Sequence, residues 1–360
     1  MKRPVIVLTG GGTAGHVSVN EAIIPTFIER GYEIHYIGSH EGIERDLIGK
    51  GHPEVTYHAI DSGKLRRYFS MKNFTDPFRV GAGVLQAFSI LRKLKPEIIF
   101  SKGGFVSVPV VLAAKLARVP VVAHESDVSP GLANKIALPF VKHIFTVFEE
   151  TLSYVPSERS SCTGAIIRPE LFEGDRKTGL RMSGLSEEKP VVIVMGGSQG
   201  SAVLNDALRG NLSVILKEFQ IIHLCGKGNL DESLDQTVGY VQFEYVTEGL
   251  PHLMAASDLA LSRAGSNAIF ELLAIRIPML LVPLSAEKSR GDQILNAKHF
   301  QKLGFAHVIN EEDVTEATLL SGLIGLADDK SNIVSIMKQT DATKTPEEMA
   351  NLILSCRTSV

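Results

Sequence analysis

Short runs of apolar, often β-branched residues alternate with longer amphipathic stretches along the whole chain. These runs lie at residues 5–8, 33–37, 55–60, 98–100, 121–123 and 143–147, and again at 191–195, 221–224, 241–243, 259–262, 279–282 and 307–309. Continuous apolar strands that alternate with helices indicate a parallel sheet covered by helices on both faces. We therefore predict an α/β protein.

The pattern restarts in the middle of the chain, which indicates two domains. The opening VIVLTGGG of the first half matches VVIVMGGS at residues 191–198 in design. The segment from Thr163 to about Lys189 contains Gly164, Pro169, Gly174 and several charges, as a linker would. We predict two Rossmann-like, doubly wound parallel-sheet domains. A final helix is expected over Thr345–Arg357, with Thr345 as its cap and Pro346 in its first position.

Composition narrows the possible functions. The chain has 360 residues, 44% of them hydrophobic, and a net charge of -3. That length suits two domains, and the charge disfavours a general nucleic-acid binder. Three widely spaced cysteines indicate a reducing compartment and buried thiols, without a disulfide framework or a zinc site. The apolar run at the N-terminus is too short for a signal peptide, and no run approaches a membrane span. We expect a cytoplasmic protein whose membrane contact, if any, is peripheral.

Two glycine loops follow predicted strands, one in each half. They are Gly10-Gly11-Gly12 with Gly15, and Gly196-Gly197 with Gly200. Such a loop lets the backbone approach a ligand closely, and the helix after it presents unpaired N–H groups, which suits phosphate. The alternative is a tight turn without a ligand, which two such loops make less attractive.

Neither loop fits the common nucleotide motifs. A dinucleotide fold needs an acidic residue at the end of the second strand, but that strand ends at Gly38-Ser39, with Glu33 before it and Glu41 after it. The phosphate-loop pattern GxxxxGK[ST] is absent. NAD(P) is therefore disfavoured, and a P-loop nucleoside triphosphatase is excluded.

His16 follows the first glycine loop, where a helix is predicted to begin. A helix N-terminus disfavours the protonated imidazole, so a neutral His16 could act as a general base. It could equally do no more than form a hydrogen bond with the loop. The residues alone leave both interpretations open.

Other polar groups follow neighbouring strands. In the first half, Ser101–Phe105 and His124–Asp127 end two strands at the same sheet edge, and Ser107 is a candidate helix cap. In the second half, Ser266 is a candidate cap and Glu271 could reach a ribose, or could be a solvated acid of the first helical turn. The segment 290–293 precedes a further helix.

The motifs GGGTAGH, SKGGFVSVP, HESDVSPGLANK, MGGSQGS, SRAGSNAIFE and GDQILNA occur in this order along nearly the whole chain. In combination they resemble the MurG family of peptidoglycan glycosyltransferases. The resemblance implies the GT-B fold, two Rossmann-like domains facing a cleft, with the last helix returning to the first domain. The implied domains are 1–164 with 341–360, which would bind the acceptor at the membrane, and 165–340, which would bind UDP-GlcNAc.

The resemblance also implies an activity. The family moves GlcNAc from UDP-GlcNAc to the C4 hydroxyl of undecaprenyl-diphospho-MurNAc-pentapeptide (lipid I), giving lipid II with inversion at the anomeric carbon. An inverting transfer needs a base for the hydroxyl and stabilisation of departing UDP. No D-x-D sequence occurs, which suits a metal-independent reaction without a cofactor.

Site residues follow from matching positions. His16 is the preferred catalytic base, with Glu125 as a second catalytic candidate and His124 and Asp127 beside it in the substrate site. The remaining substrate-binding positions are Thr13, Ala14 and Gly15 at the sugar and diphosphate, Arg168 and Ser198 at UDP, Val246 at uracil, Ser266, Asn267, Ala268, Ile269, Phe270 and Glu271 at the nucleotide, with Glu271 on the ribose, and Gln293 at GlcNAc. The chain departs from the family's usual residues at three positions: Ala14 replaces glycine, Asp127 replaces asparagine and Asp292 replaces glutamine.

Cations and bulky apolar residues are interleaved at Lys64, Leu65, Arg66, Arg67, Tyr68 and Phe69. This pattern suits an anionic bilayer surface, although a basic loop with its aromatic residues in the core is the alternative. The resemblance favours contact with the cytoplasmic face of the cell membrane and with other cell-wall synthesis proteins, while the net charge favours no nucleic-acid partner.

Three competing functions remain. A related GT-B enzyme would transfer a sugar to a different glycolipid, and a UDP-GlcNAc 2-epimerase-like enzyme would release UDP without a lipid acceptor. A non-catalytic subunit that binds nucleotide sugar would show no turnover.

Overall fold

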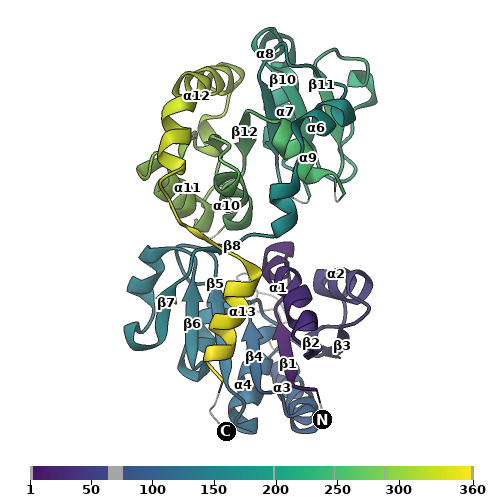
Figure 1. The fold of residues 1–360 in the computed structure, drawn as a ribbon, viewed down its shortest axis with the longest axis vertical. Helices are drawn as coiled ribbons and strands as arrows, with labels where there is room; N and C mark the ends of the chain where they lie inside the picture. Colours follow the sequence, from purple (N-terminus) through teal and green to yellow (C-terminus); the bar gives the residue numbers. More distant parts are fainter. Residues whose placement is uncertain are drawn as a thin grey trace. The chain divides into compact units, whose positions relative to one another are not determined.

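The structure is a computed structural model that describes residues 3–63, 76–197, 199–246, 248–287, 289 and 291–357. It divides into two compact units: unit 1 comprises Met1–Ile166 and Thr343–Val360, and unit 2 comprises Ile167–Ala342. Each unit contains a parallel sheet with helices on both of its faces (Figure 1). Two doubly wound domains are thus confirmed.

Unit 1 is built on a seven-stranded parallel sheet in the order β3-β2-β1-β4-β5-β6-β7. Its strands are β1 (Val5–Thr9), β2 (Glu33–Ser39), β3 (Thr56–Ile60), β4 (Ile98–Ser101), β5 (Val121–Glu125), β6 (His143–Thr146) and β7 (Ser160–Cys162). Its α-helices are α1 (Ser18–Glu29), α2 (Ile43–Gly51), α3 (Asp76–Leu94), α4 (Ser107–Ala117), α5 (Leu132–Ala137) and α13 (Pro346–Ser355). The strand order reverses between β1 and β4, which is where open α/β sheets bind ligands.

Both faces of this sheet are packed. Residues of α1, α2 and α13 form one core with alternate sheet residues, and residues of α3, α4 and α5 form the other. Helix α13 lies beside α1, although more than 300 residues separate them in sequence (Figure 1). It begins as expected, because Thr345 and Glu348 form a reciprocal capping box and Pro346 occupies the first turn. Just before it, β15 (Thr343–Lys344) pairs in parallel with β8 (Ala165–Ile166).

Unit 2 repeats the design with a six-stranded parallel sheet in the order β11-β10-β9-β12-β13-β14. The strands are β9 (Val191–Met195), β10 (Gln220–Leu224), β11 (Tyr240–Phe243), β12 (Leu259–Ser262), β13 (Met279–Leu281) and β14 (Ala306–Val308). The helices are α6 (Arg176–Ser183), α7 (Ala202–Gly210), α8 (Leu212–Glu218), α9 (Leu250–Ala256), α10 (Ser266–Ala274), α11 (Asp292–Lys302) and α12 (Glu316–Met337). Here the order reverses between β9 and β12.

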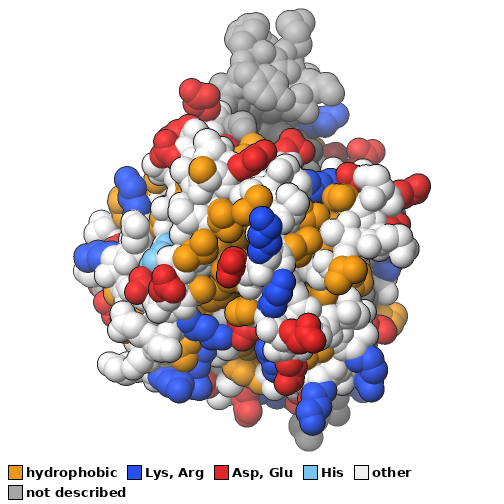
Figure 2. Space-filling model, turned by 90° about the horizontal axis from the view of Figure 1, so that it is seen from above, with side chains coloured by type: hydrophobic (Ala, Val, Ile, Leu, Met, Phe, Trp, Pro, Cys, Tyr) orange, Lys and Arg blue, Asp and Glu red, His pale blue; other side chains and the backbone are white. Residues whose placement is uncertain are grey.

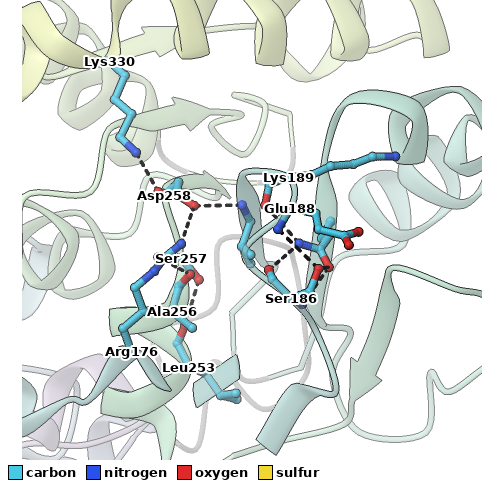
Figure 3. Close-up of polar contacts among 11 residues, drawn as sticks. Arg176, Ser186, Glu188, Lys189, Leu253, Ala256, Ser257, Asp258 and Lys330 are labelled. Carbon is cyan, nitrogen blue, oxygen red and sulfur yellow. Dashed lines mark hydrogen bonds and ion pairs between the residues drawn. The ribbon is translucent and has the colours of Figure 1, made fainter. Parts of the chain in front are cut away.

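Asp258, just before β12, connects several elements at the amino edge of the second sheet (Figure 3). Its carboxylate accepts hydrogen bonds from Arg176 of α6, Lys330 of α12 and the backbone N–H of Val191, at 3.2, 2.7 and 3.0 Å. This cluster lies at the opposite edge of the sheet from the loops that follow β9 and β12. The cluster around Asp258 therefore stabilises unit 2 away from the edge of the sheet at which a ligand would bind.

The face in Figure 2 mixes charges of both signs with hydrophobic side chains gathered near its centre, and its described part carries no large patch of one sign.

Of the three cysteines, Cys225 is buried while Cys162 and Cys356 are partly exposed. The expectation of three buried thiols is thus wrong, because two of them lie near the ends of surface elements.

Candidate functional site

In unit 1 the glycine loop after β1 and the loop after β4 touch each other at the point where the strand order reverses. A Cβ atom on Gly104 would lie closer than 3.0 Å to the backbone carbonyl of Gly11, so only glycine permits this approach. Gly12 has a φ of 88°, a conformation that side chains disfavour. These two loops therefore present backbone groups at the carboxyl edge of the sheet.

His16 lies at the end of a short 3₁₀-helix, Ala14–His16, two residues before α1. Ala14, which stands where the family usually has glycine, is the first residue of that helix. The Nδ1 atom of His16 lies 3.0 Å from the carbonyl oxygen of Gly11 and 3.1 Å from the hydroxyl of Thr13. Because a carbonyl only accepts, the contact with Gly11 is a hydrogen bond in the tautomer that carries its hydrogen on Nδ1. In the neutral ring Nε2 is then the basic nitrogen, as a general base requires.

Glu125 is buried and holds the loop that follows β5. One carboxylate oxygen accepts from the backbone N–H groups of Ser126 and Asp127, at 2.9 and 3.1 Å. The other accepts from the backbone N–H of Gly131 and from Asn134 Nδ2, both at 2.8 Å. Four donors thus surround the carboxylate, whose residue is only 6% exposed. This geometry is typical of a group that positions a loop rather than one that meets a substrate.

His124 and Lys102 lie in the interior beneath these loops. His124 is 0% exposed, and neither ring nitrogen has a hydrogen-bond partner among the described residues. Burial, with the charge of Lys102 nearby, holds the pKa of His124 well below its usual range, so the ring is neutral. The Lys102 ammonium donates to Ser126 Oγ at 2.6 Å. The side chain of His124 therefore does not line the surface that its assignment to substrate binding requires.

In unit 2 a pocket of about 410 Å³ opens where β9 and β12 end. The glycine loop after β9 lines it together with the first residues of α7 and α10. The hydroxyl of Ser201 caps α7 by accepting from the N–H of Leu204. A pocket bounded by glycines and two helix N-termini suits a diphosphate. Of the predicted substrate residues, Ala268 and Gln293 line it.

A buried ion pair supports this pocket. The Arg263 guanidinium, directly after β12, donates to Ser201 Oγ at 2.7 Å and to the carbonyl oxygen of Val282 at 3.1 Å. It also pairs with the Glu311 carboxylate at 2.5 Å, which accepts in turn from the N–H of Ser285 at 3.2 Å. One cation therefore connects the loops that follow four strands of the sheet.

Glu271 lies in the second turn of α10, so the alternative of a first-turn acid does not apply. Its carboxylate faces the Arg168 guanidinium at 3.4 Å. Burial raises the pKa of Glu271, and the charge of Arg168 partly opposes that rise. The two predicted donor residues thus lie together, although neither is among the residues that line the pocket.

The remaining predicted positions differ in exposure. Thr13 and Gly15 are exposed, whereas Asp127, Val246 and Asn267 are partly buried. Ile269 and Phe270 belong to the core, so only their backbone could meet a ligand. Gln293 uses its side-chain oxygen to accept from the N–H of Leu284 at 3.0 Å. Ser198 lies outside the described residues.

Two expected helix caps are wrong. Helices α4 and α10 begin after Val106 and Gly265, and neither has a side-chain cap. Ser107 and Ser266 are instead the first helical residues. The hydroxyl of Ser107 donates backwards to the carbonyl of Gly104 at 2.8 Å, which tightens the glycine turn.

The sequence interpretation did not single out Glu44, Arg263 or Glu311. Glu44 gave no distinct signal, because it is one of two acidic residues in the first turn of an amphipathic helix, a common pattern at surfaces. Arg263 and Glu311 stand 48 positions apart, and only the fold brings them together. The predicted membrane segment, Lys64 to Phe69, lies outside the described residues. Within the described part of the chain, no helix combines the length and the apolar character needed to cross a bilayer.

Comparison with known proteins gives the two halves the same assignment. Residues 6–146 match the glycosyltransferase family 28 N-terminal domain, and residues 191–353 match the C-terminal domain of that family. A protein of Oceanobacillus iheyensis is 54% identical over 97% of both chains, and one of Geobacillus kaustophilus is 53% identical over 98% of both. Both are named UDP-N-acetylglucosamine–N-acetylmuramyl-(pentapeptide) pyrophosphoryl-undecaprenol N-acetylglucosamine transferase.

Solved structures share the fold. MurG of Acinetobacter baumannii superposes with a TM-score of 0.77 at 20% identity, covering 98% of this chain and 100% of that one. A UDP-GlcNAc 2-epimerase of Neisseria meningitidis, bound to UDP-GlcNAc, gives a TM-score of 0.66 at 12% identity, with 98% of each chain covered. The shared architecture therefore does not separate the transferase from the epimerase.

Proposed function

The chain belongs to glycosyltransferase family 28, and from this premise we propose that it transfers GlcNAc from UDP-GlcNAc to the C4 hydroxyl of lipid I, giving lipid II for peptidoglycan synthesis. The observation that carries this proposal is near-full-length identity of 53–54% to relatives named for that transfer. The epimerase-like alternative rests on fold alone.

The transfer requires one general base and a stabilised leaving group. We assign the base to His16: with its hydrogen on Nδ1, directed at the Gly11 carbonyl, Nε2 is the basic nitrogen that would take the acceptor's C4 proton. The C4 oxygen then attacks C1 of GlcNAc, the C1–O bond to the diphosphate breaks, and UDP leaves with the bonding pair. Attack from the opposite side inverts C1 and gives the β-1,4 linkage.

We assign stabilisation of the departing diphosphate to the pocket of unit 2. Its glycine-loop amides and the N-termini of α7 and α10 supply partial positive charge. Fixed donors of this kind need no rearrangement as negative charge develops. We therefore propose that the reaction proceeds without a metal ion.

The other donor contacts are assigned by position in the family motifs. Glu271 would accept from the ribose hydroxyls and Gln293 would contact the GlcNAc hydroxyls. The remaining donor positions are Thr13, Ala14, Gly15, Arg168, Ser198, Val246, Ser266, Asn267, Ala268, Ile269 and Phe270. The pairing of Arg168 with Glu271 supports placing both at one part of the nucleotide.

We further propose that unit 1 receives the lipid acceptor and that the protein binds peripherally to the cytoplasmic face of the cell membrane, where other cell-wall synthesis proteins act. The membrane contact is assigned to a sequence segment that mixes cations with apolar residues: Lys64, Leu65, Arg66, Arg67, Tyr68 and Phe69. Asp127, on the loop held by Glu125, is our candidate for an acceptor contact.

The test is transfer of labelled GlcNAc in EDTA, with and without a lipid I analogue. Product that appears only with the acceptor would support both the transferase and its independence of metal. Release of UDP without a glycosylated acceptor would favour an epimerase or hydrolase. Donor binding without turnover, when added metal does not restore activity, would indicate a non-catalytic subunit.

The base assignment has its own test in His16→Ala. We expect turnover to fall by about 10²–10⁴-fold, with only a modest change in donor affinity. Near-normal turnover would remove His16 from the role of base.

A further inference from the structure

A carboxylate lies buried beneath the first glycine loop, and neither the family motifs nor the proposed mechanism uses it. Glu44, in the first turn of α2, is 1% exposed. Its carboxylate accepts from the backbone N–H of Gly12 and the backbone N–H of Ser39, both at 3.1 Å, and from the hydroxyl of Ser39 at 2.5 Å. Such a charged group requires partners of this kind, and the glycine loop supplies one of them.

Glycines from three segments make room for this carboxylate. A Cβ atom on Gly11 or Gly42 would lie closer than 3.0 Å to the carboxyl group of Glu44, and one on Gly38 would collide with the hydroxyl of Tyr57 and touch Cγ of Glu44. Tyr57 donates in turn to the carbonyl of Ser39 at 2.7 Å. Part of the glycine content of these loops therefore serves the carboxylate below rather than a ligand above.

The contact reaches His16 through one peptide group. The N–H of Gly12 and the carbonyl of Gly11 belong to the same planar peptide bond and point in opposite directions. Glu44 accepts from that N–H, while the carbonyl accepts from Nδ1 of His16 at 3.0 Å. The order of groups is thus carboxylate, peptide, imidazole. Hydrogen bonds in such a chain polarise one another, and each fixes the direction of the next.

We propose that Glu44 is a positioning residue that acts on His16 through the Gly11–Gly12 peptide group. By holding this peptide in one orientation, it keeps the carbonyl aimed at Nδ1 and thereby maintains the tautomer in which Nε2 is basic. An aspartate in a serine-protease triad performs the same task by direct contact with its histidine. The inference deepens the proposed function, because it gives this orientation a role in deprotonating the acceptor.

The first experiment needs no catalytic activity. In full-length protein labelled with ¹⁵N-histidine, NMR at neutral pH should show His16 with Nδ1 protonated and Nε2 unprotonated, the signals being assigned by their loss in His16→Ala. Observation of hydrogen on Nε2 instead would overturn the proposal. This result would stand whether or not the protein transfers GlcNAc, so it separates a failure here from a failure of the proposed function.

The second experiment is the variant Glu44→Gln. In either orientation of the uncharged amide, the Gly12 N–H loses its bond to a carboxylate, because it faces either the NH₂ group or a neutral amide oxygen. We expect kcat to fall by about tenfold or more, with KM for UDP-GlcNAc changed by less than about threefold, because the lost interaction orients the base rather than the donor. Unchanged kcat in a folded Glu44→Gln protein would overturn the proposal.

Two further variants distinguish positioning from general destabilisation. Asp258→Asn removes a comparably connected carboxylate from unit 2 and should lower thermal stability while leaving kcat unchanged. In the double variant His16→Ala/Glu44→Gln, loss of Glu44 should cost no additional activity, because its effect passes through His16. Multiplication of the two losses would show an independent role for Glu44 and refute the coupling. If Glu44→Gln fails to fold, the NMR measurement of the His16 tautomer in the wild-type protein becomes the test of the proposal.

Discussion

Replacement of Glu125 by glutamine distinguishes a loop-holding role from a chemical one. The carboxylate oxygens each accept two hydrogen bonds, from Ser126 and Asp127 on one side and from Gly131 and Asn134 on the other. In Glu125→Gln one of these oxygens becomes an NH₂ group. Whichever side it takes, two donors then face a third donor and lose their acceptor.

The expected cost follows from those two hydrogen bonds. A hydrogen bond to a charged group contributes about 1.5–3 kcal/mol, so loss of two should lower the free energy of unfolding by about 3–6 kcal/mol. The assay is urea denaturation of the full chain at neutral pH. Glu97→Gln is the matched control, because the carboxylate of Glu97 is 40% exposed and its pair with Arg357 should contribute less than about 1 kcal/mol.

Turnover completes this test. If Glu125 only holds the loop, turnover and stability should fall together, and conditions that restore the fold should restore part of the activity. A loss of stability below about 1 kcal/mol, accompanied by a turnover loss above about 100-fold, would refute this reasoning and return Glu125 to the chemical step.

Three further results are expected. Arg263→Met or Glu311→Met alone should destabilise the protein by about 3–5 kcal/mol, because each leaves an unpaired buried charge. In calorimetric scans the double variant should be more stable than either single variant, and additive losses of stability would contradict this coupling. Glu271→Ala should weaken UDP-GlcNAc binding at least about tenfold in titration calorimetry with the fold intact, and unchanged affinity would exclude the ribose contact. Because burial raises the pKa of the Glu271 carboxyl, the affinity of the wild-type protein should decline on acidification at a higher pH than that at which an ordinary glutamate protonates. Burial opposes ionisation of Asp258, yet hydrogen bonds from Lys330 and Val191 hold its pKa below 3.8, so the stabilisation from its carboxylate is present at neutral pH and is lost as pH falls through that lower pKa. In urea denaturation, Asp258→Asn should therefore be less stable than wild type at pH 7 and should converge with it in strong acid. A difference in stability that stays constant with pH would contradict this linkage.

The two sheets could be predicted from sequence because their signal is local. Each buried strand is a short apolar run, and each glycine loop follows such a run directly, as with Val5–Thr9 and Gly10. The capping box at Thr345 is likewise a short-range pattern. Ser107 and Ser266 show the limit of this reasoning, since a serine near a helix start can also occupy the first helical position.

The support of the site could not be predicted in the same way. Glu44 meets Gly12 across 32 positions, and Arg263 meets Glu311 across 48, so neither contact has a spacing that a sequence pattern could contain. The sequence identified Glu125 as a polar residue at a strand end. Its role depends on the four hydrogen bonds that residues of the folded loop donate to its carboxylate. Residue type at a strand end predicts where a site lies, whereas tertiary contacts decide which carboxylate is available to it.

The order in which the chain leaves the ribosome gives α13 a consequence for folding. Unit 2 is contiguous, whereas unit 1 needs residues from both before and after it. Met349, Ala350 and Ile353 of α13 are buried in the same core as Ile23 and Phe27 of α1. The N-terminal part of unit 1 therefore cannot complete one face of its core until all of unit 2 has been synthesised. During that interval, the apolar surface that α13 later covers is exposed to solvent.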